Sequence, residues 1–121
     1  MTLLQIRVHS EAEFLKVDFI GQLSREGWPL GFDPFIEHCV ENVFASQVLV
    51  NLSQLNYWDS SGLSWLVVSN ERFQNAGGAL ILHSASSLTR RFLELTRLDK
   101  VLQIAADEPA ARRLAAEALS A

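Results

Sequence analysis

The sequence is poor in cysteine, glycine, proline and positive charge. Of its 121 residues one is cysteine, so no internal disulfide can form, and a reducing compartment, the cytoplasm, is expected. With 6 glycines, 3 prolines and 49% apolar residues, the composition predicts a packed core rather than disorder. The formal net charge of -4 argues against general binding to nucleic acids or to anionic membranes.

Long apolar runs and metal-binding patterns are also missing. No stretch reaches the roughly 18 apolar residues that a membrane span needs, and the segment after Met1 lacks the features of a secretory signal. His9, His38 and His83 share no helix or strand spacing, and no zinc-ligand pattern occurs. We therefore expect one domain over residues 1–121, without metal or cofactor.

The order of apolar patterns predicts an α/β fold. Residues 3–8 and 14–20 alternate apolar and polar side chains, which indicates an antiparallel hairpin that ends at Gly21. Residues 47–52 and 79–83 are short apolar runs separated by a helical pattern, which predicts two parallel strands with a right-handed crossover. With a short edge strand at 101–104, the mixed sheet would have four or five strands.

About four helices are expected, each with a start signal and an apolar face. They begin near Asp33, Asp59, residues 84–87 and Asp107. Spacing of i, i+3, i+4 and i+7 assigns these side chains to the buried faces: Ile36, Cys39, Val40 and Val43; Leu63, Leu66, Val67 and Phe73; Leu88, Phe92 and Leu95; Ala111, Leu114, Ala115, Ala118 and Leu119. Cys39 is interpreted as a packed thiol, and Arg90 and Arg91 as a solvated face.

The segment Asp59–Ser60–Ser61–Gly62 lies where a strand gives way to a helix. Open α/β sheets place their sites at such strand ends, and the first turn of a helix favours a negative group by about 0.3 to 1 kcal/mol. Asp and Ser at a helix start are also ordinary capping residues. These residues alone therefore predict either a capped helix or a site for anion chemistry.

Three segments resemble the STAS domain of bacterial anti-sigma factor antagonists. They are VLVNLSQLNYWDSSGLSWLV from Val48, NAGGALILHSAS from Asn75 and LTRRFLELTRLDKVLQI from Leu88. The Asp-Ser-Ser-Gly-Leu core follows a predicted strand and opens a predicted helix, as in that family. The resemblance is strong from about Val48 to Ile104.

The resemblance implies partner switching controlled by phosphate. An anti-sigma factor that is also a serine kinase would phosphorylate the protein, and a serine phosphatase would reverse the modification. The family's phosphoserine follows the aspartate, which here is Ser60, with Ser61 the alternative. Asp59, Ser61, Gly62 and Leu63 match the rest of the motif, and the unphosphorylated form would bind the kinase.

The sequence departs from the family's pattern after Gly21. Ser24 stands where an acidic residue is usual, and a loop with Trp28 and Phe32 follows. Trp28 either folds back over the sheet edge or forms an exposed patch for a partner or for self-association. Trp65 and Val68 are either further core contacts or an apolar platform beside Ser60. Ser24, Trp28 and Trp65 are therefore candidate partner contacts, together with the motif residues Asp59, Ser60, Ser61, Gly62 and Leu63.

Other functions leave weaker signs. The sequence has no P-loop, no HExxH and no histidine and acid spaced to activate Ser60, so an enzyme is not expected. A STAS scaffold or a subunit of a stress-signalling or lipid-transport complex, without phosphorylation, stays the alternative. An anion or nucleotide binder lacks glycines and lysines to hold phosphates.

Overall fold

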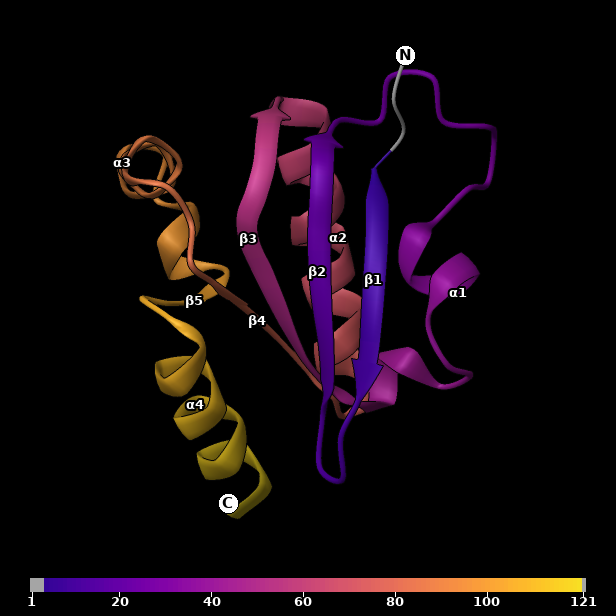
Figure 1. The fold of residues 1–121 in the computed structure, drawn as a ribbon, viewed down its shortest axis with the longest axis vertical. Helices are drawn as coiled ribbons and strands as arrows, with labels where there is room; N and C mark the ends of the chain where they lie inside the picture. The colour runs from indigo at the N-terminus through magenta and orange to yellow at the C-terminus, as the bar shows by residue number, and fades with distance from the viewer. Residues whose placement is uncertain (1–3, 121) are drawn as a thin grey trace.

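The computed structural model describes residues 4–120 and contains one mixed five-stranded sheet with strand order β1-β2-β3-β4-β5 (Figure 1). The strands are β1 (Gln5–Ser10), β2 (Leu15–Leu23), β3 (Gln47–Trp58), β4 (Ala79–His83) and β5 (Gln103–Ala105). Strand β1 pairs antiparallel with β2, and the remaining pairs are parallel. The predicted mixed sheet with an N-terminal hairpin is confirmed.

Within residues 4–120 four α-helices accompany the sheet, as predicted: α1 (Pro34–His38), α2 (Ser60–Ala76), α3 (Ser87–Leu95) and α4 (Glu108–Ser120). Two short 3-10 helices, η1 (Val43–Ala45) and η2 (Leu98–Lys100), lie in the connections. Gly77 caps α2 in the left-handed conformation at φ 88°, which glycine adopts without steric cost.

The sheet separates two apolar clusters because side chains alternate along each strand. On one face Val17, Val50 and Leu82 pack with residues of α1, α2 and α3, and this cluster is the main core. On the other face Leu49 and Ile81 pack against Ala111 and Ala115 of α4. The small alanine side chains let α4 lie close to the sheet. The apolar cluster on this face is therefore smaller than the main core.

Strands β2 and β3 run further than their sequences predict. Strand β2 continues through Gly21, at φ 95°, to Leu23, and β3 continues to Trp58, six residues beyond the strand predicted over 47–52. Register shifts between the two strands around Asp18–Gln22 break the regular alternation and explain the missed ends. Strand β3 pairs with β4 only as far as Asn51. The last residues of β3 therefore pair with β2 alone.

Helix α1 starts as predicted and ends early. The Asp33 carboxylate accepts a hydrogen bond from the Phe35 N–H at 2.9 Å, and Pro34 occupies the first turn. The helix ends at His38, so the predicted face of Ile36, Cys39, Val40 and Val43 does not exist as one stripe. Ile36 and Val40 are exposed, and Phe35 is the buried aromatic side chain.

Helices α3 and α4 also bury faces other than those predicted. In α3, Leu88 and Leu95 are each 72% exposed, whereas Thr89 and Leu93 are buried. The helix is therefore rotated by about one residue from the orientation that its leucine spacing predicts. In α4, Ala111 and Ala115 are buried as predicted, but Ala118 is exposed, and the side chain of Leu119 lies outside the described residues.

Candidate functional site

The motif occupies the junction of β3 and α2, at the carboxyl end of the sheet (Figure 1). Asp59 is the N-cap of α2, in extended conformation, and Ser60 is the first helical residue. The backbone N–H of Asp59 donates to the carbonyl of Leu23 at the end of β2. The predicted strand-to-helix position of the motif is confirmed.

The Asp59 carboxylate organises this junction through both of its oxygens. Its Oδ1 accepts hydrogen bonds from the N–H groups of Ser61 and Gly62 at 3.0 and 3.2 Å, and from the Ser61 hydroxyl at 2.6 Å. Its Oδ2 accepts from the Ser24 hydroxyl at 2.6 Å and from the Tyr57 hydroxyl at 3.4 Å. The carboxylate thus caps the helix and also joins β2, β3 and α2.

These hydrogen bonds hold the pKa of Asp59 below its ordinary value. The hydroxyl of Ser24 contributes most, followed by the hydroxyl of Ser61, while desolvation opposes them. Hydroxyl and N–H donors stabilise the charged carboxylate more than the neutral acid. The carboxylate is therefore ionised at neutral pH.

Replacing Asp59 with asparagine should make stability less dependent on pH. The lowered pKa means that the ionised carboxylate stabilises the fold above the unfolded value of about 3.9, and this stabilisation is lost as pH falls through the folded value. Asp59→Asn should lower the free energy of unfolding by about 1 kcal/mol at neutral pH, because charge-assisted hydrogen bonds weaken. Urea unfolding of both proteins from neutral to acid pH measures the difference, which should shrink toward zero.

The exposed carboxylate of Glu94 offers a matched control on α3. Glu94→Gln removes one carboxylate without touching the motif, so it measures the effect of losing a charge apart from the hydrogen bonds of Asp59. A difference between Asp59→Asn and the unmodified protein that stays constant at every pH would contradict the role given to the Asp59 carboxylate.

The two serines of the motif differ in the state of their hydroxyl groups. The Ser61 hydroxyl donates to Asp59 and accepts a hydrogen bond from the Arg25 N–H at 2.9 Å. Ser60 is exposed, and within residues 4–120 its hydroxyl has no hydrogen-bond partner. A hydroxyl that already accepts one hydrogen bond and donates another is less accessible to a second protein. Ser60 therefore has the more accessible hydroxyl of the two serines.

The capping by Asp59 limits what the start of α2 can offer to an anion. Because the N–H groups of Ser61 and Gly62 donate to the Asp59 carboxylate, they are not open to an incoming phosphate. The N–H of Leu63 donates to the Asp59 carbonyl. A phosphate on Ser60 would therefore extend outward, beside a carboxylate of the same sign, rather than fold onto the helix end.

Gly62 permits the close approach of α2 to the end of β2. A Cβ at this position would overlap the carbonyl oxygen of Leu23 and lie 2.6 Å from its carbonyl carbon, both backbone atoms that cannot move aside cheaply. Gly62 therefore acts structurally, as the point where the motif helix contacts β2, and its buried position leaves it little surface for a partner.

The loop after β2 is fixed to the motif at its first residues. Ser24 is buried, and its hydroxyl donates to Asp59 and accepts from the Glu26 N–H. An acidic residue in place of Ser24 would bring two carboxylates together and would lose this hydrogen bond. Ser24 is thus a structural partner of Asp59, whereas the neighbouring Arg25 is exposed.

The Trp28 side chain folds back onto the protein. Its ring lies 5.3 Å from those of Phe32 and Trp65, both in edge-to-face geometry, and it packs against the main core. Trp28 therefore folds back as one of the two interpretations predicts, but it packs against Trp65 of α2 rather than along the edge of the sheet. Leu30, at the loop tip, is fully exposed and is the apolar side chain that the loop presents to solvent.

Trp65 and Leu63 belong to the core, whereas Val68 is exposed. Trp65 is 5% exposed, stacks on Phe35 at 4.9 Å, and its indole N–H donates to the Asp33 carboxylate at 3.3 Å. The sequence offered Trp65 and Val68 as an apolar platform beside Ser60. In the structure only Val68 of these two is at the surface. Ser60, Val68, Leu63 and Ser64 line one side of a cavity of about 540 Å³ between α2 and α3.

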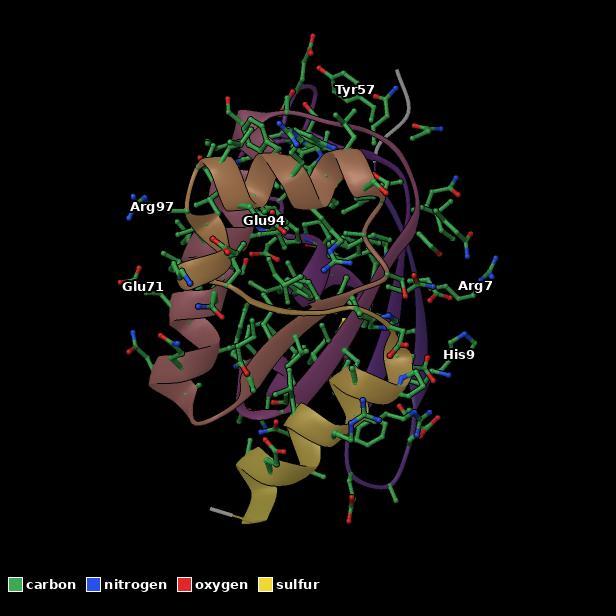
Figure 2. All side chains as sticks on the ribbon, turned by 90° about the vertical axis from the view of Figure 1, so that its left-hand side faces the viewer. Arg7, His9, Tyr57, Glu71, Glu94 and Arg97 are labelled. Atoms are coloured by element: carbon green, nitrogen blue, oxygen red, sulfur yellow. The ribbon has the colours of Figure 1, made fainter. Side chains whose placement is uncertain are left out.

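Two neighbours of the motif are not singled out by the sequence pattern. Tyr57 is exposed and donates to Asp59, and it lies at the upper end of the molecule in Figure 2. Arg25 donates its N–H to Ser61. Had β3 been predicted to run to Trp58, the alternation of side chains along a strand would have placed Tyr57 on the same side of the chain as Asp59, and this was the signal that could have found it.

The remaining candidate groups carry little chemistry. Burial raises the pKa of the Cys39 thiol to about 11, which disfavours the reactive thiolate and agrees with a packed thiol. Burial lowers the pKa of His83, whose Nδ1 lies 2.8 Å from the Ser84 hydroxyl.

Within residues 4–120, no three His, Cys, Asp or Glu side chains are arranged to hold a metal ion. Among the described helices, none has the length and apolar character needed to cross a membrane.

Comparison with known proteins finds the same fold elsewhere. The family model of the STAS domain matches residues 8–111. A candidate anti-sigma factor antagonist from Thermotoga maritima superposes with a TM-score of 0.78 at 19% identity, covering 92% of this chain and 94% of its own. An anti-sigma factor antagonist from Mycobacterium paratuberculosis gives 0.70 at 20% identity, with 94% and 95% covered. The anti-sigma factor antagonist SpoIIAA, in its unphosphorylated form, gives 0.64 at 16% identity, with 91% and 96% covered.

Proposed function

Because the chain belongs to the STAS domain family, we propose that it is an anti-sigma factor antagonist, a binding protein controlled by reversible phosphorylation of Ser60. In its unphosphorylated form it binds an anti-sigma factor that is also a serine kinase, and this binding frees the sigma factor. The kinase transfers the γ-phosphoryl group of ATP to the Ser60 oxygen, releasing ADP and the hydroxyl proton. A serine phosphatase restores the free hydroxyl.

The state of the Ser60 hydroxyl carries this proposal. It is exposed and without a hydrogen-bond partner in residues 4–120, on a helix whose start is fixed by Asp59 to both neighbouring strands. A phosphoacceptor must enter a kinase site without disturbing the fold, and a solvent-facing hydroxyl on a rigid first turn satisfies both needs. The Ser61 hydroxyl is held between Asp59 and Arg25, and it would have to leave both hydrogen bonds to react.

The neighbouring structure supports regulation by charge rather than by unfolding. The hydrogen bonds of Asp59 do not involve the Ser60 hydroxyl, so a phosphate on Ser60 leaves them in place. Phosphate adds about -1.5 to -2 charges at neutral pH. The modified protein keeps its shape and differs at the surface that its partner contacts.

Incubation with the cognate kinase and ATP tests the proposal. The intact protein should gain the mass of one phosphate, Ser60→Ala should gain none, and Ser61→Ala should gain the same amount as the unmodified protein. Phosphate appearing undiminished in Ser60→Ala would place the modification elsewhere. Binding of the kinase without any phosphate transfer would favour the alternative of a STAS scaffold that works without modification.

A further inference from the structure

A groove lies between α2 and α3, and Ser60 stands on its rim. We call it the α2–α3 groove. It has a volume of about 540 Å³ and is lined by Leu63, Val67 and Val68 from α2, by Phe92 and Leu98 from α3 and η2, and by the hydroxyl-bearing Ser60, Ser64 and Thr96. Its wall is mostly apolar, and the ring of Phe92 is held in place against Trp58 at 4.5 Å. Trp58 in turn donates its indole N–H to Thr89 at 2.8 Å, which fixes α3 to the end of β3.

The apolar surface continues from this groove over the outside of α3. Leu88 and Leu95 lie seven residues apart on one helix face and are each 72% exposed, while Val68 across the groove is 55% exposed. The leucine spacing of α3 is the spacing of a buried helix face, yet the core of this chain buries Thr89 and Leu93 instead. The apolar face of α3 is thus formed in the sequence and left open by the fold.

The segment that contains α3 has a charge of the opposite sign to that of the whole chain, whereas the α2 side of the groove carries the exposed carboxylate of Glu71. Residues 87–100 carry four cations, Arg90, Arg91, Arg97 and Lys100, and two carboxylates, Glu94 and Asp99, although the chain has a net charge of -4. Within the described part of the chain, none of these four cations forms an ion pair. Arg91 lies between Leu88 and Leu95 on the same helix face, and Arg97 extends away from the molecule beyond the end of α3 (Figure 2).

A second copy of this chain is a poor occupant for such a surface. A two-fold symmetric contact would bring α3 against α3, and with it Arg91 against the same cationic segment of the other copy. Like charges at an interface cost free energy and act against association. An apolar ridge that carries acidic side chains fits the groove, the exposed leucines and the free cations together.

We propose that the α2–α3 groove binds an acidic amphipathic helix of the partner protein, with apolar side chains in the groove and carboxylates toward Arg91 and Arg97. This inference rests on the proposed function, because the partner is the one that Ser60 controls. A helix laid between two helices presents residues i, i+4 and i+7 as one ridge, which matches a groove of this kind. A phosphate on Ser60 would then place negative charge at the rim, next to acidic residues of the bound helix.

The test uses two synthetic helical peptides with the same leucine ridge, one with glutamate and one with lysine at every other exposed position. Titration into the ¹⁵N-labelled protein should show saturable binding of the glutamate peptide, with shifts at Val68, Leu88 and Leu95. The lysine peptide should bind at least about tenfold more weakly. Binding of the glutamate peptide should weaken with added salt, because the attraction between exposed charges is screened.

Variants of the protein separate the apolar and the charged contributions. Leu95→Ser and Arg91→Glu should each weaken binding of the glutamate peptide at least about fivefold. Leu30→Ser, at the exposed loop tip, and Arg113→Glu, on α4, are the matched controls and should leave binding unchanged. Installing phosphoserine at position 60 should weaken binding of the same peptide, whether or not a kinase can modify that residue.

Several outcomes would overturn the inference. Equal affinity for both peptides would show that the cations do not select the partner, and absence of saturable binding would show that the groove is not a helix site. Concentration-dependent shifts at Leu88 and Leu95 without peptide would identify a second copy as the occupant. The phosphorylation assay reads the proposed function separately, because phosphate transfer to Ser60 does not depend on either peptide.

Discussion

Phosphate on Ser60 is expected to weaken binding of the anti-sigma factor by about 30-fold or more. A charge buried without a partner at a protein interface costs about 2 to 5 kcal/mol, and each 1.4 kcal/mol is a factor of ten in affinity. The first-turn N–H groups of Ser61 and Gly62 already donate to Asp59, so they cannot compensate the new charge. The phosphate must therefore be accommodated by the partner or exclude it.

Calorimetric titration of the anti-sigma factor with the unmodified protein and with protein carrying phosphoserine at position 60 measures this loss. Ser60→Ala should retain affinity, and Ser60→Asp, with one negative charge on a shorter side chain, should lose less than the phosphoprotein. Phosphoserine installed at Ser10, at the far end of β1, controls for charge alone. Equal affinity of the phosphorylated and unmodified proteins would refute the switch.

Phe35→Ala should be the most destabilising of the substitutions considered, by about 3 to 5 kcal/mol in the free energy of unfolding. The Phe35 ring is fully buried and contacts four other aromatic rings, those of Phe19, Phe44, Trp65 and Phe73, at centroid distances from 4.9 to 6.3 Å. Removing it leaves a cavity that these large rings cannot fill by small movements. Urea unfolding monitored by tryptophan fluorescence measures the change.

The neighbouring Ile36 provides the control for this substitution. It lies one residue further along the same short helix and is 53% exposed, so Ile36→Ala should change the free energy of unfolding by about 0.5 kcal/mol or less. The pair also tests the structure against the apolar spacing, which assigned Ile36 to the core. A larger loss for Ile36→Ala than for Phe35→Ala would show that α1 is oriented as the spacing predicts.

The sequence predicts the parts of the fold where local signals and tertiary packing agree. The parallel strands β3 and β4 and the N-cap at Asp59 have strong local signatures, and the structure contains each of them. In α1 and α3 the signals conflict. Apolar spacing identifies which residues could be buried. Which of them are buried depends on the aromatic packing around Phe35 in α1 and on the contact of Trp58 with α3. Both sets of contacts involve residues that are distant in sequence.

The candidate site was predictable in identity and much less so in geometry. The motif indicates Asp59 and Ser60, but its sequence does not tell which serine is hydrogen-bonded, and that difference separates Ser60 from Ser61. Ser24, Gly62 and Trp65 are named by the same reasoning as partner contacts, and the structure shows each of them buried in intramolecular contacts. The spacing of residues in a sequence cannot distinguish a buried residue that supports a surface from an exposed residue that a partner contacts.

The unequal lengths of β3 and β4 determine what holds the motif in place. The last residues of β3 pair with β2 alone, so the motif stands on a part of the sheet supported from one side and by the contact of Trp58 with α3. Asp59 closes this end, because its backbone N–H donates to Leu23 and its carboxylate accepts from Ser24. Since Ser60 is already exposed on that closed end, the proposed kinase would reach its hydroxyl without separating any pair of strands.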